Sequence, residues 1–379
     1  MPATETTQKD PVIVVLQLTG GNDYLNTVIP YNNPLYRDNR KAVGISDNNM
    51  IHLDGNYAIP DYMAPMKKFW DEQKLAVLHG VGFKDSPRSH FRAMDIWHTC
   101  EPEKVGTEGW LGKVAREFDP NKENVVQIVS MGPSLPRSLV APGVPVACVA
   151  GPLERYGFLP QVQGNERAHV LDRFAKMYSG AIGSGPVMDY LSETATDSLK
   201  GEDIIKEVPG KYSSTVQYPN TPIARKLKGI AQVHIGDIGT RIFYCDHSTF
   251  DTHAGQNPAH GNLWSAVSQG VEAFFADLRE HNKSDNVIML LFSEFGRRVR
   301  DNGSGTDHGA GGVAFVLGEK VAGGHYGEMP SLEASKLVQG DLNPNMDFRS
   351  IYSTILDKWL GLNPAQIVNG TFEKPAFLH

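Results

Sequence analysis

The feature that most constrains the fold is an almost wholly apolar run, Asn286 to Phe292, which leads directly to Glu294. Such runs are typical of strands that are buried on both faces of a parallel sheet. Ligand sites in open α/β sheets lie just beyond the carboxyl ends of such strands. Arg297 and the adjacent pair Asp307 and His308 follow in a glycine-rich stretch. We therefore expect acid, arginine and imidazole side chains at this edge of the sheet.

Other apolar segments have the length and flanking turns of strands. They are residues 12–18, 75–78, 125–129, 144–149, 241–245 and 313–317. Segments with helical spacing of apolar residues alternate with them, at 62–73, 85–99, 223–235, 262–281 and 350–360. This alternation predicts an α/β fold, a three-layer sandwich whose central, mostly parallel sheet carries helices on both faces.

The domain organisation follows from where strand signals are found. The 379 residues fit one large α/β domain, because such domains often use this length. Residues 152 to 230 have few strand signals and two helical ones, at 167–178 and 186–199. We predict a single domain over residues 1–379, with a mainly helical insertion at about 152–230.

Charge and composition limit the partners. The formal net charge of −7 does not favour nucleic acid or an anionic membrane surface. No apolar run approaches the length of a membrane span. Three widely spaced cysteines suggest neither a disulfide framework nor a zinc ribbon. As it stands, the chain is expected in the cytoplasm, and in the periplasm or outside the cell if a leader has been removed.

A second group of possible ligands follows the strand at 241–245. Asp251 and His253 are two residues apart, so in an extended backbone both side chains point the same way. Alone, the pair also fits an Asx-turn before a helix, and Asp307 with His308 also fits a solvated loop. A mixed Asp, Glu and His set suits zinc, manganese or iron, and the sequence does not choose among them.

Ser89 is the candidate nucleophile. It lies in the first turn of the helix expected at 85–99, where the helix dipole and free N–H groups favour an anion. A nearby metal would lower the pKa of its hydroxyl. Equally, Ser86 could cap the helix and Ser89 only complete its first turn. Arg88 and Arg297 could each clamp an anion, but each also fits a structural role.

The large aromatic side chains are expected in the core rather than on a recognition surface. This prediction covers Trp97, Trp110, Trp264, Phe91 and Phe274. The adjacent glycines at 20 and 21 do not form a dinucleotide-binding fingerprint, because the third glycine is missing and no helix opens there.

Together, these motifs resemble a bacterial family known as domain of unknown function 1501. The stretches that carry the resemblance are Leu18–Thr27, Arg88–Phe91, Phe250–Ala254, Phe292–Arg298, Thr306–Gly309 and Asp347–Tyr352. That family is grouped with the alkaline phosphatase and sulfatase superfamily. The resemblance implies an alkaline phosphatase-like domain that binds one or two divalent metals.

The resemblance also implies roles for particular residues. The expected metal ligands are Asp23, Asp251, His253, Glu294, Asp307 and His308. The expected catalytic side chains are Ser89 as nucleophile, with His90, Arg88 and Arg297. Glu294-Phe295 stands where the superfamily usually has Asp-His, and Asp251 and His253 are more closely spaced than their counterparts in alkaline phosphatases.

The sequence thus predicts a metal-dependent hydrolase of phosphate or sulfate esters that acts through a serine nucleophile on a small anionic ester. The Glu294-Phe295 departure motivates an alternative of another class, an inactive scaffold that serves as a binding or assembly partner. A metal enzyme of another reaction type, such as an oxygen-using iron enzyme, is the third hypothesis.

Overall fold

The structure is a computed structural model and describes residues 9–157, 164–179 and 185–379. Within these residues, nine strands form one sheet in the order β10-β4-β9-β8-β1-β7-β5-β6, with β11 paired to β4. The strands are β1 (Val12–Leu18), β4 (Leu75–Gly82), β5 (Ile128–Met131), β6 (Ala147–Cys148), β7 (Ile242–His247), β8 (Val287–Phe292), β9 (Gly312–Gly318), β10 (Gly324–Tyr326) and β11 (Met346–Asp347). Only β9 runs antiparallel to its neighbours, so the predicted mostly parallel sheet is confirmed. A small hairpin, β2 (Met50–His52) and β3 (Ala58–Pro60), stands apart from it.

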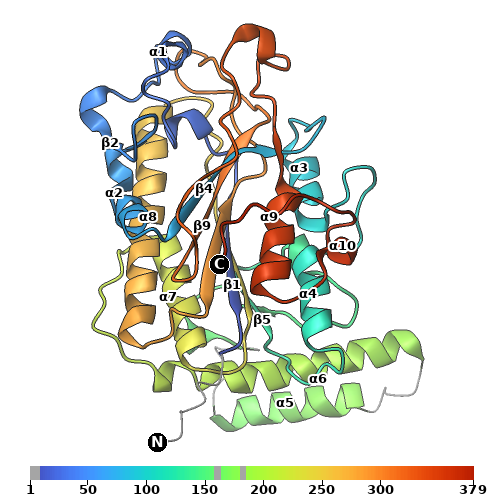
Figure 1. Cartoon of the computed structure of the whole chain (residues 1–379). Coiled ribbons are helices and arrows are strands. Elements are labelled where there is room, and N and C mark those ends of the chain that lie inside the picture. The colour runs from blue at the N-terminus through green and yellow to red at the C-terminus, as the bar shows by residue number, and fades with distance from the viewer. Residues whose placement is uncertain (1–8, 158–163, 180–184) are drawn as a thin grey trace, which may run out of the picture.

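Helices cover both faces of this sheet, as predicted (Figure 1). One face carries α2 (Ala64–Asp71), α7 (Pro222–Ile235) and α8 (Gln256–Glu280), and the other carries α3 (His90–Thr99), α4 (Trp110–Phe118), α9 (Phe348–Thr354) and α10 (Pro364–Ile367). Strand β1 shows why two cores form. Val14 and Leu16 pack in one core and Ile13 and Val15 in the other, because successive strand side chains point to opposite faces.

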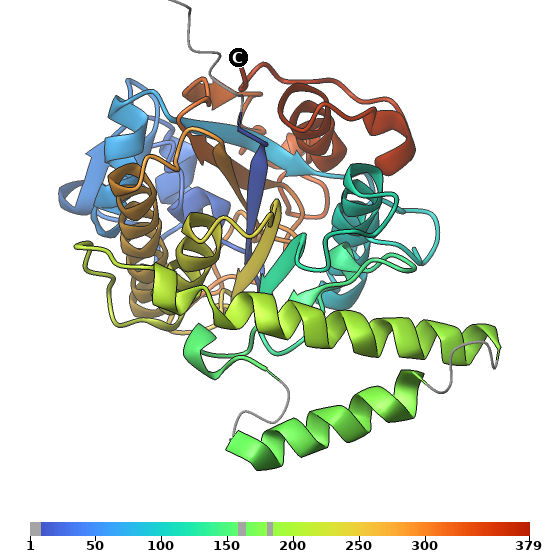
Figure 2. The same ribbon diagram turned by 90° about the horizontal axis from the view of Figure 1, so that it is seen from below.

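The part of the chain expected to be an insertion contains α5 (Gly164–Ser179) and α6 (Pro186–Lys206). Figure 2 shows α6 crossing beneath the sheet, with α5 on its outer side. The description of residues 152–230 as an insertion into one domain stays a prediction. The remaining α-helix, α1 (Pro34–Asn39), lies in the segment after β1. In the described part of the chain, no helix is long and apolar enough to cross a membrane.

Two local expectations were wrong. The helix expected at 85–99 begins only at His90, because Asp85 has φ 56° and Ser89 is the extended N-cap residue. Phe91 is not a core residue, since 87% of it is exposed, whereas Trp97, Trp110 and Trp264 are buried as predicted.

Candidate metal centre

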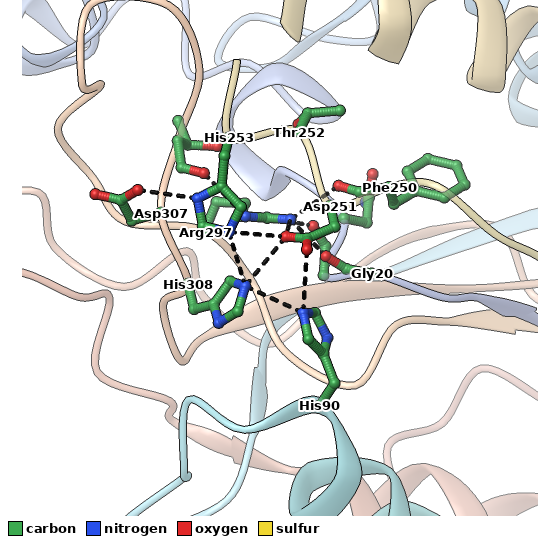
Figure 3. Close-up of polar contacts among 12 residues, drawn as sticks. Gly20, His90, Phe250, Asp251, Thr252, His253, Arg297, Asp307 and His308 are labelled. Carbon is green, nitrogen blue, oxygen red and sulfur yellow. Dashed lines mark hydrogen bonds and ion pairs between the residues drawn. The ribbon is translucent and has the colours of Figure 1, made fainter.

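The site forms where the segments that follow β1, β4, β7 and β8 meet (Figure 3). In the parallel register, Leu18 of β1 pairs with His247 of β7 and Gln17 with Phe292 of β8, so these strands end side by side. Gly20 allows the segment after β1 to approach the backbone of Asp251 closely. It has φ +124°, and a Cβ there would lie 2.4 Å from the backbone nitrogen of Asp251, so a larger residue would displace the Asp251 segment.

Three side chains from different segments form the centre of the site. The Nε2 atoms of His90 and His308 are 3.0 Å apart, and His308 Nε2 lies 3.1 Å from Asp251 Oδ1. His90 Nε2 is 3.5 Å from Asp251 Oδ2. Candidate ligand atoms of all three residues lie within 4.8 Å of one another. Four ligand atoms around a tetrahedral zinc ion are about 3.3 Å apart, so these separations have the scale of a metal site.

Hydrogen bonds at the opposite ring nitrogens fix how the two imidazoles face this centre. His90 Nδ1 is 2.7 Å from Glu294 Oε1, and His308 Nδ1 is 2.9 Å from the backbone carbonyl oxygen of Arg88. Each Nδ1 must carry the proton, because a carboxylate and a carbonyl only accept. In the neutral rings both Nε2 lone pairs then face one another and Asp251, and a cation between them relieves the repulsion. Metal-bound histidines typically have such acceptors behind them.

The charges around the centre also favour a cation. The hydrogen bond to Glu294 raises the pKa of His90, despite its partial burial. Partial burial alone would raise the pKa of Asp251, but the hydrogen bond and charge of Arg297, together with His308 and His253, outweigh it and lower the pKa. Asp251 therefore stays a carboxylate at neutral pH.

His253 repeats the same arrangement on the more exposed side. Its Nε2 lies 3.0 Å from both Asp251 Oδ1 and His308 Nε2, and its Nδ1 is 3.0 Å from Asp307 Oδ1. The hydrogen bond from His253 lowers the pKa of Asp307. His253 therefore lies together with His308 and Asp251, as the sequence predicts. Asp307 does not point at the centre of the site, because its carboxylate contacts the opposite ring nitrogen of His253.

Glu294 lies behind His90 and not among the facing Nε2 atoms. It is fully buried, and its Oε1 also accepts a hydrogen bond from the backbone N–H of Gly20 at 2.9 Å. Its Oε2 lies 3.2 Å from Ser293 Oγ. In this arrangement Glu294, expected to be a metal ligand, orients an imidazole instead.

The expected convergence of Asp23 with His253 and His308 is not found. Asp23 is fully buried, and its Oδ1 and Oδ2 accept hydrogen bonds from Arg40, at 2.8 Å for Oδ1, with a further bond from Gln256 to Oδ2. Burial alone would raise its pKa, but the charge and hydrogen bonds of Arg40, with smaller contributions from His260 and Gln256, together lower it. In this structure the Asp23 carboxylate, predicted from the sequence to be a metal ligand, is instead paired with Arg40 and bonded to Gln256.

The two arginines expected to bind an anion are engaged elsewhere. Arg297 is 1% exposed and donates to the backbone carbonyls of Gly20, Gly21, Phe250 and Thr306 and to Asp251. It thereby ties the segments after β1, β7 and β8 together. The guanidinium of Arg88 pairs with Asp341, 2.7 Å away, and only its carbonyl oxygen reaches the site.

Ser89 lies at the start of α3, immediately before His90. It is exposed, and its hydroxyl makes no capping hydrogen bond. The alternative in which Ser86 caps this helix is wrong, because Ser89 is the N-cap residue and Ser86 Oγ is buried without a hydrogen-bond partner. The sequence missed Arg40 and Gln256, and neither carries a local signal of its contact with Asp23.

Comparison with known proteins supports the resemblance seen in the motifs. Residues 208–378 match the model of a family described as "Protein of unknown function (DUF1501)", which confirms the resemblance over that part of the chain. The motifs at 18–27 and 88–91 lie outside the matched residues. No curated protein matches the sequence.

Several solved structures are similar in fold at low sequence identity. One is PsFucS1, a sulfatase from Pseudoalteromonas sp. (13% identity, TM-score 0.42), for which the match covers 98% of this chain and 72% of that one. Another is a protein in the alkaline phosphatase superfamily from Vibrio parahaemolyticus (9% identity, TM-score 0.41, 95% and 71% covered). The C-terminal periplasmic domain of EcEptC from Escherichia coli also matches (9% identity, TM-score 0.38, 96% and 88% covered).

Proposed function

We propose that this protein is a metal-dependent hydrolase of phosphate or sulfate esters. The observation that carries the proposal is the convergence of His90 Nε2, His308 Nε2 and the Asp251 carboxylate at the carboxyl ends of the strands. The donor set is rich in imidazole, which suits zinc better than magnesium or calcium, with manganese and iron as the alternatives. A bound divalent ion would polarise the ester and lower the pKa of a nearby hydroxyl.

Ser89 is the nucleophile in this proposal. It directly precedes His90, and its hydroxyl is exposed and not engaged as a cap. Its oxygen forms a bond to phosphorus or sulfur as the ester bond breaks, and the departing alcohol takes up a proton. Water then releases the phosphate or sulfate from the serine. The ester's remaining oxygens would lie against the first backbone N–H groups of α3, which lack partners within the helix.

The engaged arginines change one part of the sequence-based hypothesis. Arg88 and Arg297 do not act as free anion clamps here, because Asp341 and the four backbone carbonyls hold their guanidinium groups. We assign Arg297 a positioning role, since it fixes Asp251 and the glycine turn after β1.

A second candidate function has its own support. Two histidines and one carboxylate with open positions are also the ligand set of non-haem iron oxygenases. A metal enzyme of that reaction type is therefore the runner-up. The third reading, a scaffold without catalysis, requires that no stoichiometric ion binds.

The test begins with elemental analysis of the purified protein, followed by metal removal and reloading with zinc, manganese or iron. Each form is assayed against aryl phosphate and aryl sulfate esters. The proposal predicts one bound zinc per chain and turnover that Ser89→Ala abolishes while Ser86→Ala retains it. Unchanged turnover in Ser89→Ala would remove the nucleophile from the proposal, and iron with oxygen uptake would favour the runner-up. No bound ion in any form would leave the scaffold reading.

A further inference from the structure

A second cavity opens at the same edge of the sheet, away from the metal centre. Its volume is about 420 Å³, and it lies between α7 and the segments that follow β5 and β6. We call it the α7 cavity. Lys226 of its lining bonds to Asp246 at the end of β7, 2.7 Å away. Asp251 comes five positions after Asp246, so their Cα atoms are at most about 18 Å apart. The two sites are neighbours but share no lining residue.

The body of the α7 cavity is apolar. Met131, Val149, Leu153 and Pro222 are among its lining residues. Met131 and Gly229 of helix α7 are packed closely together in the lining of the cavity. A Cβ at Gly229 would lie 3.1 Å from the Cε atom of Met131. Glycine inside a helix is less favourable than alanine by about 1 kcal/mol. Here it lets the Met131 side chain lie against the bare helix backbone. A volume above 300 Å³ with apolar walls is typical of small-molecule sites.

The polar groups of the α7 cavity are few, and they favour an anion. Arg225 and Lys228, one helical turn apart on α7, make no ion pair within the described residues, whereas Lys226 is paired with Asp246. Arg225 Nη1 donates to Asn220 Oδ1 at 2.9 Å, and Lys228 Nζ lies 5.9 Å from the centre of the Tyr212 ring; both partners are neutral and lie outside the lining. Glu154 is the one acidic lining residue. The unpaired charges therefore leave an excess of one positive charge. Gln232 adds a polar group that is 8% exposed and whose side-chain amide makes no hydrogen bond within the described residues.

We propose that the α7 cavity binds a small apolar molecule that carries one anionic group. The apolar body would fill the space over Met131 and Leu153, the anionic group would lie by Arg225 and Lys228, and Gln232 would bond a polar atom of the ligand. This site is independent of the metal centre and of the reaction proposed for it, because none of its lining residues is a candidate metal ligand.

Two glycines of the lining have room for an added Cβ, so we expect larger side chains there to take up part of the cavity. A Cβ at Gly151 meets no atom within 4 Å, and one at Gly132 meets only Asp246 Oδ1 at 3.8 Å. Gly151→Trp and Gly132→Leu therefore introduce bulk from two different positions. Gly55→Trp is the matched control, because Gly55 also has open space around it and lies outside the cavity.

The probe is 8-anilino-1-naphthalenesulfonate, an aromatic sulfonate whose fluorescence reports binding to the full-length folded protein. We expect saturable one-site binding, weakened at least tenfold by Gly151→Trp and by Gly132→Leu and changed less than twofold by Gly55→Trp. The double variant Arg225→Ala with Lys228→Ala should weaken the sulfonate at least fivefold but leave neutral N-phenyl-1-naphthylamine unchanged. His308→Ala should leave the probe's Kd unchanged, which separates this site from the metal centre.

Thermal unfolding of each variant identifies those that remain folded, and only these are compared. Unchanged probe affinity in a folded filling variant would overturn the proposal. Equal loss of the charged and the neutral probe in the double variant would overturn its anionic specificity. If a filling variant does not fold, the other filling variant and the charge pair decide the result.

Discussion

His90 and His308 present their Nε2 atoms to each other at 3.0 Å, although the Nδ1 atom of each ring already has an acceptor. Neutral imidazoles in this arrangement repel one another, and either a cation between them or a proton on one Nε2 atom removes the repulsion. Asp251 supplies the matching negative charge, and Arg297 keeps that carboxylate in place. The site therefore resembles a preorganised set of metal ligands, because the hydrogen bonds that orient His90, His308 and Asp251 are already formed.

Glu294→Gln tests whether the carboxylate behind His90 supports metal binding. The substitution keeps the size of a buried side chain that contacts His90 and the Gly20 N–H, but it removes the negative charge. Loss of such a partner typically weakens metal binding 10–100-fold, and we expect a weakening in this range. Competition with a fluorescent chelator measures the affinity. Asp277→Asn, which changes another fully buried carboxylate bonded to Tyr212 and Tyr218, should leave it unchanged. Parent affinity in Glu294→Gln would contradict the orienting role.

Arg40→Met should destabilise the fold strongly. Arg40 and Asp23 are both fully buried, and the substitution leaves the Asp23 carboxylate without its countercharge. Breaking such a pair from one side lowers the free energy of unfolding by about 3–5 kcal/mol. Chemical denaturation measures the loss. Replacing both residues, with Asp23→Leu and Arg40→Met, should recover most of it, because no unpaired charge remains. A double variant as unstable as the single one would show that the pair contributes more than charge compensation.

The contrast between Asp23 and His308 shows what the sequence could and could not predict. Apolar runs located the main strands, and the ends of parallel strands share one edge, so His308, Asp251 and His253 were placed together correctly. Asp23 also follows a strand, but Arg40 directly follows α1, in the irregular segment between β1 and β4, and no periodic signal there indicates its contact with Asp23. Which charged group a long loop brings to a buried carboxylate depends on tertiary packing. Local pattern does not encode it.

The start of α3 shows a second limit. A capping residue and a proline predicted a helix from position 85, but the helix begins at His90. The later start makes Ser89 the N-cap and places His90 and Phe91 in the first turn of α3. Of these two, Phe91 is exposed and His90 points at His308, and tertiary packing decides which of them faces the site. The antiparallel direction of β9 was also not predicted, because a buried strand reads the same in either direction.

Stability should fall as the pH is lowered below about 6.5, in part through His79. Burial lowers the pKa of His79 from 6.5 to about 3, and its ring is bonded to the Tyr24 hydroxyl at 2.6 Å and to His325 at 2.7 Å. In the unfolded chain the imidazole takes up a proton near pH 6.5, whereas in the folded protein it stays neutral until about pH 3. Protonation therefore favours the unfolded state throughout this window, by up to about 1.4 kcal/mol per pH unit.

Denaturation at pH 7.5, 6.5, 5.5 and 4.5 measures this dependence. His79→Gln cannot be protonated, so its stability should fall less steeply between pH 6.5 and 4.5 than that of the parent. The control is His52→Gln, at an exposed histidine, which should keep the parent slope. An unchanged slope in His79→Gln would mean that other groups account for the acid sensitivity.

Phe91 should act on substrate binding and not on stability. It follows His90 in the first turn of α3, and 87% of it is exposed, the highest value among the large apolar side chains of the described residues. We expect this exposed ring to contact an apolar part of the proposed ester substrate, and its burial there to contribute about 1–2 kcal/mol. Phe91→Ala should therefore raise KM about 5–30-fold for aryl esters and much less for methyl esters. The free energy of unfolding should change by less than about 0.5 kcal/mol.

Tyr190→Ala is the matched control, because Tyr190 is an exposed aromatic residue on α6, and it should leave both KM values unchanged. Equal effects of Phe91→Ala on aryl and methyl esters would contradict a contact with the apolar group.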